Sequence, residues 1–200
     1  MESFFESMTP WARDDGSLHV YVLPDESLAD RLDGAAELLV GAEHLPRMPR
    51  AWLHFTVARL AQFDDIGQSG LSKLCDALGR RLASIAAFTI ELGRPQIGAT
   101  SVGCEAPSTP QWDELVQAVR GAAADAFPEE VVPAGPHGPH VSLAYATGPV
   151  DDGALWPRVG AVAELGEFKI RQVHLVSVTV RPELGTFDWT ELANWDLRGQ

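Results

Sequence analysis

Two histidines of this chain each stand two residues before a threonine or a serine, within a run of β-branched and aromatic residues. The first pair is His54 with Thr56, and the second is His140 with Ser142. Because side chains at positions i and i+2 of a strand point to the same face, we expect each imidazole to lie beside its own hydroxyl. Only these two of the six histidines carry the pattern.

Two such pairs around one cleft have the groups that phosphodiester cleavage requires. A neutral imidazole takes a proton from the nucleophile, and a protonated imidazole gives one to the leaving group. Histidine suits both roles because its unperturbed pKa is about 6.5. The hydroxyls of Thr56 and Ser142 can donate hydrogen bonds to phosphate oxygens. We therefore expect His54 and His140 to be catalytic, in a scheme that uses no metal or other cofactor.

Other interpretations of the histidines stay open at this stage. Most histidines are structural, so one motif alone would be weak, and it is the repetition that favours function. A zinc site of His54, His137 and His140 is a weaker hypothesis, because no acidic or cysteine ligand stands at a characteristic spacing. A non-catalytic module that binds a nucleotide or an RNA end would use the same pocket without turnover.

The composition indicates a globular, acidic protein with a small substrate. Hydrophobic residues make up 46% of the 200 residues, enough for a core, and 28 acidic residues against 15 basic ones give a formal net charge of −13. Such a surface repels polyanions at long range, so we expect no long nucleic acid as a partner. A small nucleotide or a short RNA-end phosphoester remains compatible, because a local cationic pocket outweighs a distant acidic surface.

The sequence favours a cytoplasmic protein without membrane contact. Its first residues show no signal-peptide pattern, and no segment approaches the roughly 18 apolar residues of a membrane span. The two cysteines, Cys75 and Cys104, lack metal-ligand spacing. We interpret them as reduced thiols, although one disulfide would also fit.

The elements that must position the histidines follow from periodicity and capping. A strand is expected over 17–23, followed by a helix that starts near Asp25 to Ser27 and runs to about Val40. A helix is also expected over about 71–87. The segment 88–92 alternates like a strand, and 99–105 is predicted to be its return partner after a Gly/Pro turn.

The second half repeats this order around its own histidine. Thr109 and Pro110 mark a helix start, because a hydroxyl cap precedes a first-turn proline. The second histidine strand follows, then a short helix over about 152–164, a long strand over 168–180 and a last strand near 195–197. We therefore predict an α+β fold of mostly antiparallel sheets covered by helices. Residues 1–16 are expected to be a loosely attached N-terminal arm, and 17–200 a single domain.

At this point the motifs resemble those of a known family. The segments Trp52–Val57, Pro139–Tyr145 and Val173–Ser177 are similar to motifs of the two-histidine (2H) phosphoesterase superfamily, and more narrowly of the 2′-5′ RNA ligase family of bacterial, LigT-like proteins. The resemblance runs from about Leu18 to Leu197. It implies a bilobal fold with two pseudo-symmetric lobes and an active-site groove between them.

The resemblance also implies an activity and a set of site residues. Members include 2′,3′-cyclic nucleotide phosphodiesterases, enzymes acting on 2′-5′ linkages, and reversible RNA ligases. Carried over, His54 and His140 would be the catalytic pair, and Thr56 and Ser142 the phosphate-binding hydroxyls. Ser142 departs from the threonine of many relatives but keeps the hydroxyl. We expect a phosphodiesterase that hydrolyses a small cyclic or 2′-5′-linked nucleotide, with ligation the less favoured activity in so acidic a chain.

Four further residues are candidates for the groove. Arg181 and Arg59 could neutralise a phosphate, although a solvated surface position is the better interpretation for Arg59. Tyr145 could stack a base at the groove mouth. His137 lies in a Gly/Pro-rich loop, where it would line the groove or face solvent.

Overall fold

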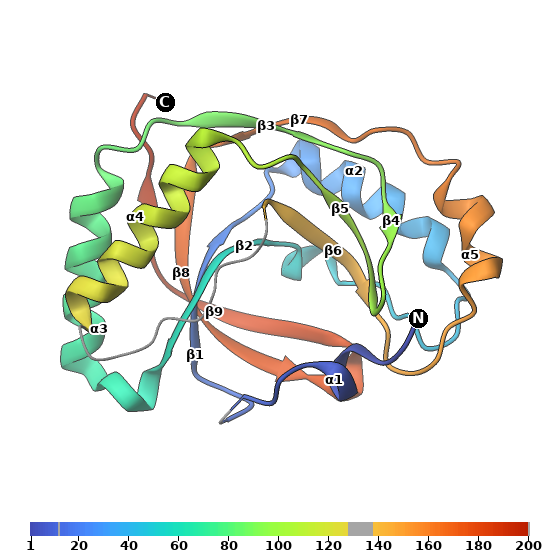
Figure 1. Cartoon of the computed structure of the whole chain (residues 1–200), viewed down its shortest axis with the longest axis horizontal. Coiled ribbons are helices and arrows are strands. Elements are labelled where there is room, and N and C mark those ends of the chain that lie inside the picture. Colours follow the sequence, from blue (N-terminus) through green and yellow to red (C-terminus); the bar gives the residue numbers. More distant parts are fainter. Residues whose placement is uncertain (12, 128–137, 200) are drawn as a thin grey trace.

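The protein has an α+β fold with a large antiparallel sheet, seen in a computed structural model that describes residues 1–11, 13–127 and 138–199 (Figure 1). The described strands of the large sheet lie in the order β4-β5-β6-β2-β1-β8-β9. Their bounds are β1 Ser17–Val22, β2 Phe55–Gln62, β4 Gln96–Ile97, β5 Ser101–Glu105, β6 His140–Tyr145, β8 Gln172–Arg181 and β9 Thr186–Asp196. A separate antiparallel pair is formed by β3 (Phe88–Leu92) and β7 (Gly166–Ile170). The predicted class, α+β with antiparallel sheets, is confirmed.

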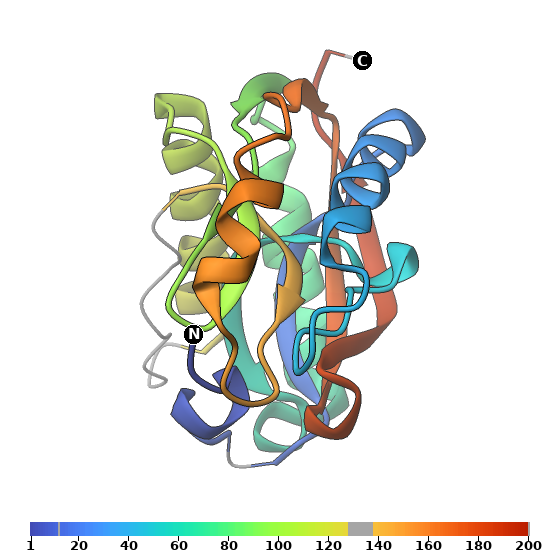
Figure 2. The same cartoon turned by 90° about the vertical axis from the view of Figure 1, so that its right-hand side faces the viewer.

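Helices cover the sheet on both sides of its centre. Their bounds are α1 Phe4–Ser7, α2 Glu26–Ala36, α3 Phe63–Leu82, α4 Pro110–Ala126 and α5 Asp152–Val159, with short 3-10 turns at Glu37–Leu39, Arg50–Trp52 and Pro182–Leu184. Helices α3 and α4 lie side by side and contact β2, whereas α2 contacts β6 (Figures 1 and 2). The predicted caps of α2 and α4 are confirmed, since Asp25 and Thr109 accept hydrogen bonds from the backbone N–H of Leu28 and Trp112.

The centre of the sheet is the junction between β2 and β6. Only one residue pair, Phe55 opposite Val141, joins these two strands in the described sheet. Phe55 and Val141 are both buried, and the ring of Phe55 stacks on Phe168 of β7 at 5.6 Å. The two histidine motifs therefore meet at the junction of β2 and β6, where a single residue pair joins the strands.

The N-terminal segment is fastened to the sheet. The Glu2 and Phe4 N–H groups donate to the carbonyls of Ala99 and Ala146, and the N-terminal ammonium contacts Asp152. The ring of Phe4 packs against Tyr145 at 4.4 Å. The loose attachment expected for residues 1–16 therefore does not describe this segment. Aromatic residues within this otherwise polar segment make the packing contacts with the sheet.

Three expectations about strands and helices were wrong. Strand β5 pairs with β4 and β6, while β3 pairs with β7, so 99–105 is not the return partner of 88–92. The long strand predicted over 168–180 is divided between β7 and β8, which belong to different sheets. The helix expected from about 71 begins at Phe63 and is kinked at Gly67, whose φ is 59°. Pairing between strands distant in sequence leaves no local signal, which explains the first two errors.

None of the helices in the described segments is both long and apolar enough to span a bilayer. Cys75 and Cys104 are both free thiols, and burial raises the pKa of Cys104 to about 12.

Candidate active site

The structure brings both motif pairs to one cavity of about 400 Å³. His54, Thr56, His140 and Ser142 all line it. His54 is buried, and the other three are half-buried. The two pairs therefore lie around one cleft, as phosphodiester cleavage would require, and four groups suited to phosphate chemistry share one cavity.

The register of β2 and β6 explains this convergence. In an antiparallel pair, residues directly opposite each other point to the same face, and their neighbours point to the other face. Since Phe55 is opposite Val141, His54 comes beside Ser142 and Thr56 comes beside His140. The two motifs are thus related by a local two-fold axis that passes through the Phe55–Val141 pair.

Both imidazoles are held in the same way. The Nδ1 atom of His54 lies 2.7 Å from the carbonyl oxygen of Trp52, and that of His140 lies 3.1 Å from the carbonyl oxygen of Gly138. A carbonyl only accepts, so Nδ1–H donates in each ring. This fixes the tautomer, and it leaves Nε2 of each neutral ring free to take a proton.

His54 is enclosed by aromatic side chains. Tyr21 stacks on its ring at 4.1 Å, and Trp189 meets its ring edge-on at 5.1 Å. Burial lowers the pKa of His54 to about 4, with a smaller lowering from His140 that the hydrogen bond to Trp52 opposes. His54 is therefore neutral at physiological pH, as a general base must be.

A tyrosine accompanies each motif hydroxyl. Burial raises the pKa of Tyr21, Tyr145 raises it further, and the interaction of the Tyr21 hydroxyl with Thr56 partly offsets this. Burial likewise raises the pKa of Tyr145, opposed by its interaction with Ser142. Both phenols stay protonated at neutral pH. A phenol that donates to the motif hydroxyl leaves that hydroxyl's own proton free for a phosphate oxygen.

A β-bulge at the same place in each half brings one more residue to the cavity. Tyr21 is opposite Thr56 and His19 is opposite Arg59, so one residue of β2 between Thr56 and Arg59 is unpaired. Such a bulge shifts the alternation and turns Arg59 to the face of Thr56.

The second half repeats the arrangement with other side chains. Gly103 is opposite Ser142 and Ser101 is opposite Tyr145. The unpaired residue therefore lies in β6, between Ser142 and Tyr145. Tyr145 thus occupies the position in this half that Arg59 occupies in the first, and both line the cavity.

The remaining groove candidates lie elsewhere or outside the described residues. Arg181 donates to Asp188 at 2.8 Å and does not line the cavity. His137 falls in 128–137, outside the residues that the structure describes. Tyr145 lines the cavity as expected, packed against Phe4 and Phe187.

Sequence reasoning missed several residues of the cavity wall. Arg59 lines the cavity, so its interpretation as a solvated surface residue was wrong. Strict alternation along the strand would place Arg59 on the opposite face from Thr56, but the bulge turns it to the same face. His19 and Tyr21 also line the cavity, and their spacing of two within a strand was an available signal. Phe4, Met8, Thr9 and Trp11 come from the N-terminal segment, for which the sequence offered no signal.

The donors around the cavity suit an anion. None of its described lining residues is an aspartate, glutamate or cysteine. Among the residues that the structure describes, no group of three or more His, Cys, Asp or Glu side chains could hold a metal ion. The cavity wall therefore offers imidazole, hydroxyl and guanidinium groups.

The fold and the doubled histidine motif together are those of the two-histidine (2H) phosphoesterase superfamily. The sequence profile of the 2′-5′ RNA ligase superfamily matches residues 24–181. The chain therefore belongs to the 2′-5′ RNA ligase superfamily.

Solved structures show the same fold. TT0787 of Thermus thermophilus is 19% identical, with a TM-score of 0.73, and the match covers 92% of this chain and 99% of that chain. LigT of E. coli in complex with 3′-AMP is 15% identical, with a TM-score of 0.68, and the match covers 92% and 98%. No significant match was found among curated protein sequences.

Proposed function

We propose that the protein is a phosphodiesterase that hydrolyses a small 2′,3′-cyclic or 2′-5′-linked nucleotide without a metal. One observation carries the proposal: two histidines, each fixed through Nδ1 and each next to a motif hydroxyl, line one cavity. The family assignment supports the reaction class.

The different burial of the two histidines suggests their roles. His54 is kept neutral by burial, so its Nε2 takes a proton from the attacking water. The general acid is then His140, the half-buried histidine of the pair, whose Nε2–H gives a proton to the departing ribose oxygen. The water oxygen bonds to phosphorus, the bond to that ribose oxygen breaks, and a phosphomonoester leaves. Thr56 and Ser142 donate to the non-bridging oxygens, where negative charge is held.

The cavity and the charge of the chain favour a small substrate. A volume of about 400 Å³ lies in the range of small-molecule sites and suits a single nucleotide. The net charge of −13 opposes a long polyanion. The E. coli LigT structures contain 3′-AMP and ATP, which are nucleotides of this size. Hydrolysis is thus favoured over the joining of long RNA ends, although the family name records ligation.

Turnover of adenosine 2′,3′-cyclic phosphate tests the proposal. We expect hydrolysis by the wild type in the presence of a chelator, and a loss of about 10²–10⁴-fold in kcat for His54→Ala and His140→Ala. His44→Asn is the matched control, because His44 lies outside the cavity and asparagine tolerates its φ of 59°. Binding of the cyclic nucleotide without turnover would indicate the non-catalytic module instead.

A further inference from the structure

Arg59 stands out at one end of the cavity. Its guanidinium lies over the ring of Trp11, 4.6 Å from the ring centroid. Its Nε is buried without a hydrogen-bond partner, and the described residues offer it no carboxylate. Burial lowers the pKa of Arg59, yet the group remains charged. A half-buried cation without a counter-ion is unfavourable unless an anion joins it.

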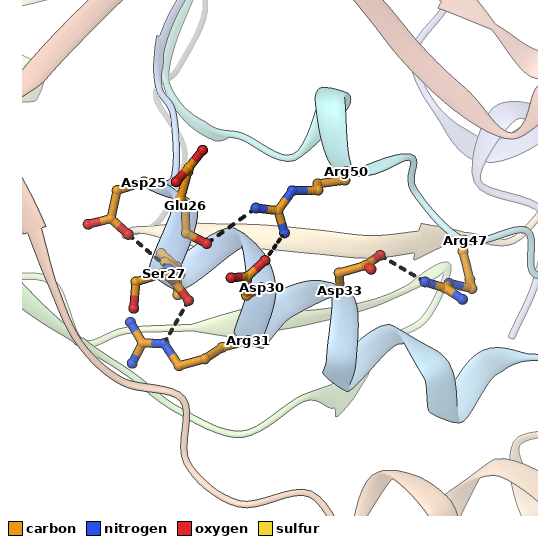
Figure 3. A network of polar contacts seen from close by, with 9 residues as sticks. Asp25, Glu26, Ser27, Asp30, Arg31, Asp33, Arg47 and Arg50 are labelled. Atoms are coloured by element: carbon orange, nitrogen blue, oxygen red, sulfur yellow. Dashed lines mark hydrogen bonds and ion pairs between the residues drawn. The ribbon is translucent and has the colours of Figure 1, made fainter.

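Other arginines of this acidic chain show the contrast. Arg47 is paired with Asp33, and Arg50 is paired with Asp30 (Figure 3). Arg47 is also paired with Glu37. Arg81, Arg94 and Arg181 each have a carboxylate as well. Acidic residues outnumber basic ones by 28 to 15, so carboxylates are plentiful. Among the described residues that line the cavity there is nevertheless no carboxylate beside Arg59.

His19 adds a second polar group at this end. It is only 6% exposed, and its ring lies 5.3 Å from that of Trp11. Its Nε2 lies 3.2 Å from Ser17 Oγ, while its Nδ1 is buried with no partner in the described structure. When Ser17 donates to Nε2, Nδ1 carries the proton and is a donor available to an anion. Burial, His54 and Arg59 all lower the pKa of His19, so the ring is neutral and donates through its one N–H.

This end of the cavity is set apart from the reacting phosphate. Arg59 is opposite His19, and Thr56 is opposite Tyr21, two residues along β1. A strand rises about 3.3 Å per residue, so the two positions lie roughly 7 Å apart. The phosphate between the histidines belongs at the Phe55–Val141 axis, on the inner side of Thr56. The backbone of Arg59 therefore lies three residues along β1 from that axis, roughly 10 Å away, and its long side chain lines the same cavity. An anion bound by its guanidinium is then within reach of the 5′ end of a nucleotide whose other phosphate lies at the histidines.

We propose that Arg59, supported by Trp11 and His19, binds a second anionic group of the substrate, the 5′-phosphate of a nucleotide whose other phosphate reacts at the histidines. This inference rests on the proposed function for the position of the reacting phosphate. The equivalent end of the other half carries Tyr145 and Ser101 and has no cation among its described residues. The substrate is therefore bound in one direction, with its 5′ end toward β1.

Binding of product analogues tests the second subsite without turnover. Titration calorimetry would compare adenosine 3′,5′-bisphosphate with 3′-AMP. We expect the bisphosphate to bind the wild type about tenfold or more tightly, as a charge-assisted contact predicts. In Arg59→Gln this ratio should fall to about one while 3′-AMP keeps its affinity. Arg59→Lys should retain part of the ratio, because it keeps the charge but loses the two-pronged geometry.

A matched control separates the subsite from a general effect of charge. Arg181→Gln removes the same charge outside the cavity and should leave the ratio unchanged. Equal affinities of the wild type for both compounds would overturn the inference, as would equal losses for both in Arg59→Gln, which would place Arg59 at the reacting phosphate. The proposed function is tested in a separate experiment, which measures turnover of adenosine 2′,3′-cyclic phosphate with and without a 5′-phosphate. Absence of any turnover contradicts the proposed function alone, because the binding ratio still decides the subsite.

Discussion

The two halves of the cavity share a backbone arrangement but differ in side chains. The β1–β2 half and the β5–β6 half each supply a histidine anchored to a carbonyl two residues earlier, a hydroxyl two residues later and a bulge just beyond. At matching positions the first half carries Arg59, Tyr21 and His19, whereas the second carries Tyr145, Gly103 and Ser101. The shared backbone places the reacting groups, and the different side chains give the site a direction.

The two halves also differ in the strand that supplies the tyrosine beside the motif hydroxyl. In the first half Tyr21 reaches Thr56 from the neighbouring strand, and in the second Tyr145 reaches Ser142 from the same strand. Gly103 occupies the position equivalent to Tyr21, where a Cβ would lie 2.6 Å from the carbonyl oxygen of Val141. No side chain fits there. The tyrosine therefore occupies position 145, and only the first half has room for an arginine at the equivalent position 59.

Removing the motif hydroxyls tests whether the two halves contribute equally to phosphate binding. Thr56→Val and Ser142→Ala each remove one donor to the charge that develops on phosphate, so we expect kcat to fall about 10²-fold for each. Steady-state hydrolysis of a 2′,3′-cyclic nucleotide measures this. Thr56→Ser, which keeps the hydroxyl, should stay within about tenfold of the wild type. A loss for only one of the two positions would argue that the halves do not share the phosphate.

Removing the tyrosine hydroxyls should have a smaller and matched effect. Tyr21→Phe and Tyr145→Phe keep the packed rings but remove the phenol hydroxyl that interacts with Thr56 or Ser142. We expect kcat to fall about tenfold for each, in line with the loss of one hydrogen bond. Adding Tyr21→Phe to Thr56→Val should then cost little more, because the phenol acts through the threonine. Additive losses in this double-mutant cycle would contradict that role.

The burial of His54 in the first half predicts a pH dependence of stability. The pKa of His54 is about 4 in the folded protein and about 6.5 when unfolded, so the unfolded state binds more protons between these values. The free energy of unfolding should therefore fall as pH drops from 6.5 towards 4, by about 3 kcal/mol from this residue. His19, whose pKa is also lowered, acts in the same direction.

Urea unfolding at pH 7 and pH 4.5 measures this dependence. His54→Asn, which cannot titrate, should lose less stability than the wild type over the same interval. The acid limb of kcat/KM should likewise lie near pH 4 rather than near 6.5. Equal losses of stability in the two proteins would show that His54 titrates normally.

The convergence of the four motif residues on one cavity was more predictable from the sequence than the rest of the cavity wall. His54, Thr56, His140 and Ser142 were found because strand alternation is a local rule that one strand displays by itself. Arg59 escaped because the bulge that turns it to the cavity exists only in the pairing of β1 with β2. The aromatic contribution of Phe4 and Trp11 escaped for a similar reason, since a short polar segment gives no sign of the surface on which it docks.

The assignment of His54 as the general base and His140 as the general acid is tested most directly by changing the leaving group of the substrate. A nucleoside p-nitrophenyl phosphodiester releases p-nitrophenolate, which needs no proton from a general acid. On this substrate we predict that His140→Ala recovers to within about tenfold of the wild type, whereas His54→Ala stays about 10²-fold or more below it. Recovery of His54→Ala instead, or equal behaviour of the two variants, would contradict the assignment of base and acid to the two halves.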